Sequence, residues 1–155
     1  MKLARIVLFA LAALLALPAG AQTSSDMQIL AEKIKADRKL VIAANMQLTE
    51  DEAKGFWPVY DAYQADLRKI NARLLGTIKR YADAYNKGAV SDETARKLIN
   101  EAIAIEDAEV KLKRSYLPKL EKAIPGVKAA RYLQIENKIR AVTRYELAAQ
   151  IPLVQ

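Results

Sequence analysis

Acidic residues come nearest to a catalytic arrangement in this sequence. Carboxylates cluster at positions 50–52 and again at positions 106–109, and two carboxylates held together can act as a general acid and a general base. Neighbouring positions on a helix point in different directions, however, and acids at a helix start are favoured by the helix dipole. We therefore predict that neither cluster is catalytic and that the protein is not an enzyme.

The rest of the composition excludes most other chemistry. The chain contains no cysteine and no histidine, which removes the usual ligands of zinc, copper, haem and iron–sulfur clusters. Nucleophilic triads that use histidine are excluded as well. Five glycines form no phosphate-binding loop, and no loop has the ligand spacing of a calcium site. We expect no cofactor and no bound metal.

The first 21 residues have the pattern of a secretory signal peptide. Lys2 and Arg5 provide the positive start, an apolar run follows at 6–17, and small residues occupy 19–21. A retained membrane anchor is the alternative, but the run is short for a bilayer. We predict a signal peptide at 1–21 and a periplasmic location, with residues 22–155 forming a single all-helical domain held together by packing.

Positive charge is concentrated in the C-terminal part of the chain. The segment from Val110 to the end has a net charge of +7, whereas the segment between residue 22 and Val110 has a net charge of −2. Such a surface could face acidic partners, anionic lipid headgroups or aggregating client chains, or it could simply keep the protein soluble. Because the protein is expected to be exported, we expect no nucleic acid partner.

The stretch from Leu48 to Pro58 organises the predicted fold. Thr49 can cap a helix, and Glu52 lies three residues later, where its side chain can accept the Thr49 backbone N–H, which is the pattern of a capping box. Leu48 precedes the cap and gives a weak hydrophobic staple. Pro58 then falls inside the helix, where a missing N–H predicts a kink. Two aromatic residues adjoin this kink and are expected to pack structurally, namely Phe56 and Trp57.

The spacing of apolar residues predicts four helices and no strands. The first helix covers 26–45 and the second covers 50–86, whose apolar stripe has steps of three and four throughout. The members of that stripe are Phe56, Tyr60, Tyr63, Leu67, Ile70, Leu74, Ile78, Tyr81 and Tyr85.

Two further helices complete the prediction. Gly88 ends the second helix, and Ser91 caps a third helix over 92–123 that contains Pro118. Since the loop is short, the second and third helices should be antiparallel. A fourth helix covers 127–149 and has a less regular pattern; the residues expected to be buried in it are Ala130, Leu133, Val142, Tyr145 and Leu147. The predicted fold is a long, kinked antiparallel hairpin with flanking helices.

These features resemble the Spy/CpxP family of periplasmic proteins, whose signature is an LTxxQ motif. The motif stands here as residues 48–52, with Glu52 in place of glutamine, which preserves the capping geometry. A second copy of the motif is degenerate, with Ile124 and Pro125 as its nearest match. The resemblance covers most of the chain in architecture but only some five residues in motif.

The resemblance implies a curved antiparallel dimer of long helices whose concave face is basic and apolar. Spy-like proteins are ATP-independent chaperones that hold unfolded proteins, and CpxP-like proteins restrain an envelope-stress sensor kinase. A related branch of heavy-metal sensors binds metal through histidine, and the lack of histidine here argues against that branch.

Two functions follow as expectations. The first is capture of unfolded or envelope proteins, by attraction to cations and loose holding by aromatic side chains; surface contact with a membrane is also possible, without insertion. The second is docking of one partner, such as an envelope sensor or an anti-sigma factor. The candidate contacts are Lys111, Lys113, Arg114, Arg131, Arg140 and Arg144 with Tyr116, Tyr132 and Tyr145, although core or dimer packing is the alternative role for each tyrosine.

Overall fold

The computed structural model describes residues 38–154. The prediction of a signal peptide at 1–21, and that of a helix between residues 26 and 37, therefore lie outside the described residues. Residues 38–46 are helical, and three long helices follow, namely α2 (Glu50–Tyr85), α3 (Asp92–Ala123) and α4 (Gly126–Gln150). No strand occurs between residues 38 and 154. The prediction of an all-α fold with four helices is confirmed.

Helix α2 begins at the predicted capping box. The Thr49 hydroxyl accepts the Glu52 N–H at 3.3 Å, and the Glu52 carboxylate accepts the Thr49 N–H at 2.8 Å. Lys128, at the start of α4, donates to the same carboxylate. The hydrogen bond from Lys128, together with that from the Thr49 backbone, lowers the pKa of Glu52. The capping box of α2 therefore also binds the beginning of α4 through Lys128.

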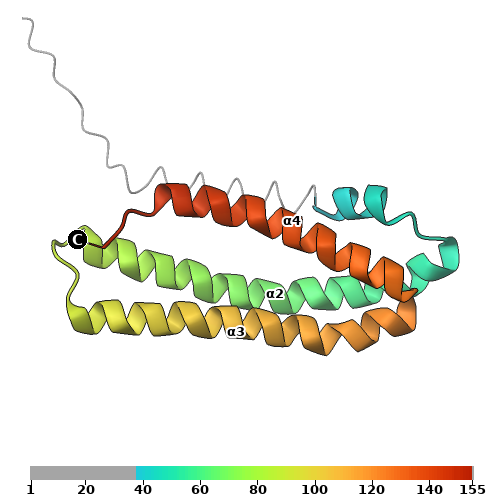
Figure 1. The fold of residues 1–155 in the computed structure, drawn as a ribbon, viewed down its shortest axis with the longest axis horizontal. Coiled ribbons are helices and arrows are strands. Elements are labelled where there is room, and N and C mark those ends of the chain that lie inside the picture. The colour runs from blue at the N-terminus through green and yellow to red at the C-terminus, as the bar shows by residue number, and fades with distance from the viewer. Residues whose placement is uncertain (1–37, 155) are drawn as a thin grey trace, which may run out of the picture. The chain divides into compact units, whose positions relative to one another are not determined.

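Helices α2 and α3 lie side by side and run in opposite directions (Figure 1). The Tyr116 hydroxyl donates to Asp66 at 2.7 Å, and further along the pair Arg73 lies 3.1 Å from Glu101. Residues further along α2 therefore face residues earlier in α3, so the two helices are antiparallel. Helix α4 runs back along this pair from the end at which α3 finishes (Figure 1).

The turn between α2 and α3 uses the predicted residues. Gly88 has a φ of +125°, which L side chains rarely adopt. The Ser91 hydroxyl then accepts the Thr94 N–H at 3.3 Å and caps α3. Pro58 and Pro118 lie inside α2 and α3, and both helices continue through them.

The core lies in the half of the helix pair that contains the start of α2. Tyr132 of α4 is fully buried there, and its ring centroid lies 5.2 Å from Phe56, 6.0 Å from Tyr60 and 5.9 Å from Tyr63. Trp57 is partly buried and packs edge-on against Phe56, with 5.0 Å between the centroids. Edge-to-face contacts of this kind are worth about 1 kcal/mol each beyond the area that they bury. Aromatic contacts of α2 with α4 and with α3 therefore hold the three long helices together at this end.

The apolar stripe predicted for α2 is buried along only part of its length. Its members from Phe56 to Ile70 are buried, whereas Leu74, Ile78 and Tyr81 are only partly covered. The covered part includes Phe56, Tyr60 and Tyr63, which contact Tyr132 of α4. The other part is left open and forms a wall of the groove described below.

The prediction of the buried face of α4 is wrong in most positions. Ala130, Val142 and Tyr145 are exposed, while Leu133 and Leu147 are partly buried. The buried residues of α4 are instead Ala129, Tyr132 and Glu136. The physical reason is that α4 inserts a tyrosine and a carboxylate toward polar partners on α2, so its buried positions are not all apolar.

Candidate functional site

Two arginines of α4 are held by acids of α3. The carboxylate of Glu109 lies 2.6 Å from Arg140 and 2.9 Å from Arg144, and Glu106 lies 3.5 Å from Arg144. Glu109 is almost fully buried. A buried carboxylate that accepts two guanidinium groups is a strong, geometry-specific link between helices.

Lys113 belongs to the same cluster. Its ammonium group donates to the Asn137 side chain at 3.1 Å. Partial burial, followed by the nearby positive charge of Arg140, lowers the pKa of Lys113. The lysine is therefore an inward-facing part of the contact between α3 and α4.

A second polar contact joins α2 to α4 in the interior. The Gln64 amide donates to Glu136 at 2.9 Å and to the Tyr132 hydroxyl at 3.3 Å, and all three side chains are buried. Burial, and then the negative charge of Glu136, raises the pKa of the Tyr132 hydroxyl. Glu136 lies among the residues of α4 that the sequence pattern left unassigned, and its partner is 72 positions away in the chain.

Five of the residues predicted to contact a client make contacts within the protein itself. Tyr116 and Tyr132 are buried in the core, so they cannot touch a client in this fold. Lys113, Arg140 and Arg144 are engaged by side chains of the protein itself. Tyr116 and Tyr132 thus have the core role that was the alternative for each tyrosine, whereas Lys113, Arg140 and the exposed Arg144 are paired within the protein, contrary to the expectation of a free basic surface.

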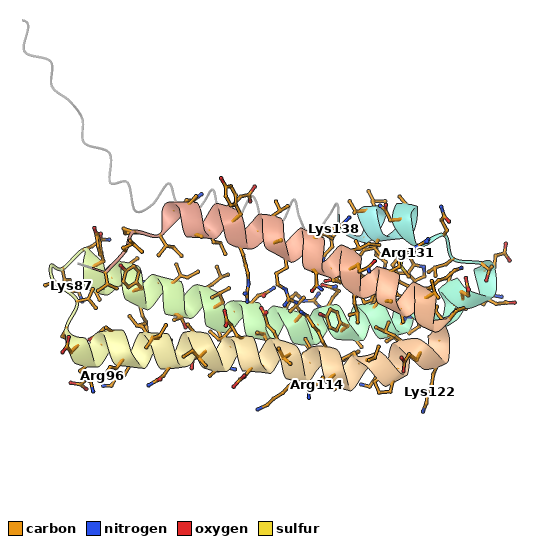
Figure 2. The ribbon with its side chains drawn as sticks, in the orientation of Figure 1. Lys87, Arg96, Arg114, Lys122, Arg131 and Lys138 are labelled. Carbon is orange, nitrogen blue, oxygen red and sulfur yellow. The ribbon has the colours of Figure 1, made fainter. Side chains whose placement is uncertain are left out.

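The other predicted contacts are exposed but lie on different helices. Lys111 and Arg114 are exposed on α3, whereas Arg131 is exposed on α4. Figure 2 shows Arg114 beside α3 and Arg131 beside α4, on different parts of the molecule. Tyr145 is 78% exposed. The structure therefore does not gather the predicted cations into one patch.

Helix α3 instead carries an exposed stripe that combines aliphatic and basic side chains. Its three aliphatic members, Ile99, Ile103 and Val110, are 57%, 53% and 48% exposed. At 3.6 residues per turn, the stripe lies on the side of α3 opposite the buried positions Ile105, Tyr116 and Leu120. We call it the outer stripe of α3, and it consists of Arg96, Ile99, Ile103, Val110, Lys111 and Arg114. Sequence analysis missed its aliphatic members, although their helical spacing was visible.

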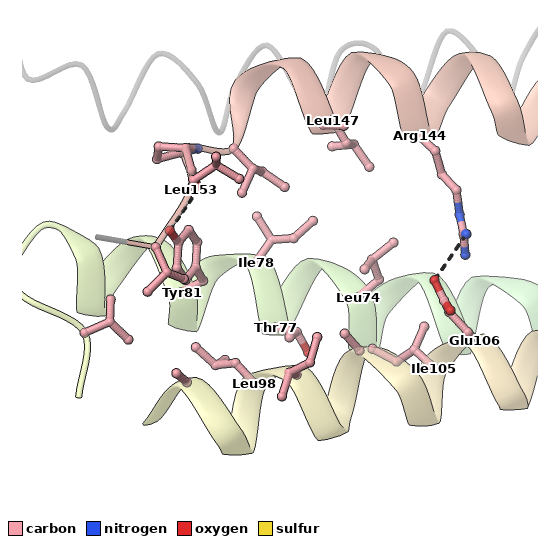
Figure 3. A pocket seen from close by; sticks show the side chains of 18 of the residues that line it. Leu74, Thr77, Ile78, Tyr81, Leu98, Ile105, Glu106, Arg144, Leu147 and Leu153 are labelled. Carbon is pink, nitrogen blue, oxygen red and sulfur yellow. Dashed lines mark hydrogen bonds and ion pairs between the residues drawn. The ribbon is translucent and has the colours of Figure 1, made fainter. Parts of the chain in front are cut away.

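A largely apolar groove lies between α2, α3, α4 and the C-terminal residues, with a volume of about 770 Å³ (Figure 3). Arg144 and Glu106 face each other at one end of it, and Leu153 and Tyr81 lie at the other (Figure 3). The Tyr81 hydroxyl donates to the Pro152 carbonyl at 2.9 Å, which fixes the last residues as a wall. Most of the lining is aliphatic, and its members include Leu74, Ile78, Leu98, Ile99, Ala102, Ile105, Leu147, Ala148, Ile151 and Val154.

Between residues 38 and 154, no three acidic side chains converge in a way that could hold a metal ion. Within the same residues, no helix combines the length and the apolar character needed to span a membrane. Comparison of the chain with protein families, with curated proteins and with solved structures found no match.

Proposed function

We propose that this protein is an ATP-independent, chaperone-like protein of the periplasm that holds unfolded or aggregation-prone proteins. The observation that carries the proposal is the outer stripe of α3. Three large aliphatic side chains are exposed there between three cations, and exposed apolar patches bordered by charge are typical of interaction surfaces.

The chemistry of the stripe suits unfolded clients. Arg96, Lys111 and Arg114 attract acidic chains over distances of about 8 Å at physiological ionic strength. Ile103 and Val110 then offer apolar contact without the depth of a pocket, which favours loose and reversible holding. The resemblance to Spy/CpxP-like proteins supports the same function, together with export after removal of residues 1–21, a kinked hairpin and a curved homodimer.

The test is aggregation of several chemically denatured proteins, followed by light scattering without ATP. We expect suppression by the protein at near-stoichiometric ratios, and loss of most suppression in Ile103→Gln. Val142→Gln is the matched control, because Val142 is an equally exposed aliphatic residue of α4, outside the stripe.

The same assay separates the proposal from its alternative. Suppression of unrelated clients supports a general chaperone. Failure with every client overturns that function and favours a dedicated partner, such as an envelope sensor or an anti-sigma factor, which crosslinking in the envelope would identify. Equal effects of Ile103→Gln and Val142→Gln would remove the stripe from the mechanism.

A further inference from the structure

We propose that the groove between α2, α3 and α4 binds a fatty acid, with the hydrocarbon chain along α2 and α3 and the carboxylate beside Arg144. The groove shares Arg96 and Ile99 with the outer stripe of α3, but the rest of its lining, including Arg144, lies outside that stripe, and the proposal does not depend on chaperone function.

The walls of the groove suit a hydrocarbon and not an extended peptide. Backbone N–H and C=O groups of the helical walls are already bonded within the helices, so a peptide backbone placed there would lose its own hydrogen bonds. The polar side chains in the walls are also engaged: the Thr77 hydroxyl donates to the Arg73 carbonyl at 2.9 Å, and the Tyr81 hydroxyl donates to Pro152. A saturated chain requires none of these groups.

The dimensions fit a single chain. A volume of about 770 Å³ lies within the range of small-molecule pockets, roughly 300–1,000 Å³. The lining on α3 extends from Ala95 to Glu106, which at 1.5 Å per residue is about 16 Å. The site is therefore elongated along the helix pair, as a single hydrocarbon chain is.

Charge at the groove favours an anionic head group. Arg144 is the cation at one end of the lining, where Glu106 is the acid, and Arg96 lies ten residues before Glu106 on α3, toward the other end. Arg144 binds Glu109 at 2.9 Å through one nitrogen and reaches Glu106 only at 3.5 Å through the other. A ligand carboxylate can take the place of Glu106 without disturbing the buried bond to Glu109, since Glu106 is largely exposed and can turn to solvent.

The experiment is calorimetric titration of the purified protein with dodecanoate, and with dodecyltrimethylammonium as a ligand of equal chain length and opposite charge. We expect saturable binding of one dodecanoate, and binding of the cation weaker by roughly fivefold or more. In the series decanoate, dodecanoate and tetradecanoate, each methylene should tighten Kd by about fourfold while the groove has room. Equal binding of cation and anion would overturn the assignment of the head group.

Phenylalanine substitutions at two alanines of α3 test where the ligand binds. Ala102 lines the groove and Ala104 is exposed outside it, so Ala102→Phe should abolish binding while Ala104→Phe leaves Kd unchanged. Retained binding in Ala102→Phe would place the ligand elsewhere and overturn the proposal.

A further variant tests the position of the ligand carboxylate without blocking the groove. Glu106→Gln removes the acid that competes for Arg144 at an exposed position, and we expect dodecanoate to bind about two- to fivefold more tightly. An unchanged or weaker Kd would show that the carboxylate does not lie beside Arg144. Binding only of an amphipathic helical peptide, with no saturable binding of dodecanoate, would overturn the proposal in favour of a protein ligand.

Discussion

The carboxylate of Glu109 on α3 lies 2.6 Å from the guanidinium of Arg140 on α4, and their side chains are only 6% and 16% exposed. Arg144 shares the same carboxylate at 2.9 Å. One acid therefore pairs with two of the cations that give the C-terminal segment its high formal charge and offsets one of their two positive charges. This pairing fixes α4 along the helix pair, between the aromatic core on one side and the apolar groove on the other.

Removing the charge of Glu109 should destabilise the fold strongly. Glu109→Gln leaves the shielded guanidinium of Arg140 without its counter-ion, and breaking a buried pair in this way costs about 3–5 kcal/mol. Glu106→Gln is the matched control on the same helix, because its pair with Arg144 is exposed and worth about 0.5 kcal/mol. Urea unfolding followed by circular dichroism measures both. Similar midpoints for the two variants would show that the buried Glu109 pair adds no more stability than the exposed Glu106 pair.

Local signals in the sequence predicted the helices well. The capping box at Thr49, the glycine at Gly88 and the cap at Ser91 act within a few residues, so each is visible in the chain itself. The predicted boundaries of α2, α3 and α4 agree with the structure to within a residue or two. The early part of the apolar stripe of α2, from Phe56 to Ile70, is buried as predicted.

Contacts between distant parts of the chain were not predictable in the same way. Tyr132 and Arg140 were named as candidate client contacts, with core packing as the alternative for the tyrosine, because their partners, Gln64 and Glu109, lie on other helices. The pattern of α4 has no clear apolar face, since Glu136 is among its buried residues. Without the position of α4 along the helix pair, neither the internal pairing of charges nor the groove can be derived from periodicity.

The capping box should contribute measurable stability at the start of α2. Thr49→Ala removes the hydroxyl that accepts the Glu52 N–H, and loss of such a cap costs about 1 kcal/mol. Thr143→Ala is the matched control, because Thr143 bonds the Ile139 carbonyl inside α4 and caps nothing. Urea midpoints should fall for Thr49→Ala and change little for Thr143→Ala. A larger loss in Thr143→Ala would contradict the role assigned to the cap.

Two glycines should respond in opposite directions to the same substitution. A methyl group at Gly76 would meet only an Arg80 nitrogen at 3.8 Å, and one at Gly88 would meet nothing within 4 Å. Space is therefore available at both positions, and backbone conformation decides the result. Gly76→Ala should stabilise the protein by about 1 kcal/mol through helix propensity.

Gly88→Ala should destabilise it by about 1 kcal/mol or more, because its φ of +125° is unfavourable for alanine. Thermal unfolding of the two variants beside the parent protein checks both expectations. A stabilised Gly88→Ala would mean that the turn adopts another conformation in solution.

Tyr116 should make the fold sensitive to alkaline pH. Burial, together with the hydrogen bond to Asp66, raises the pKa of Tyr116 from 10 to about 12. The folded protein thus keeps a proton that the unfolded chain loses, so this stabilisation is complete below pH 10 and is lost as the pH rises through about 12. Tyr116→Phe should flatten the decline of the urea midpoint over this interval, whereas Tyr145→Phe, at an exposed tyrosine, should not. Parallel declines in both variants would show that Tyr116 ionises alike in the folded and unfolded states.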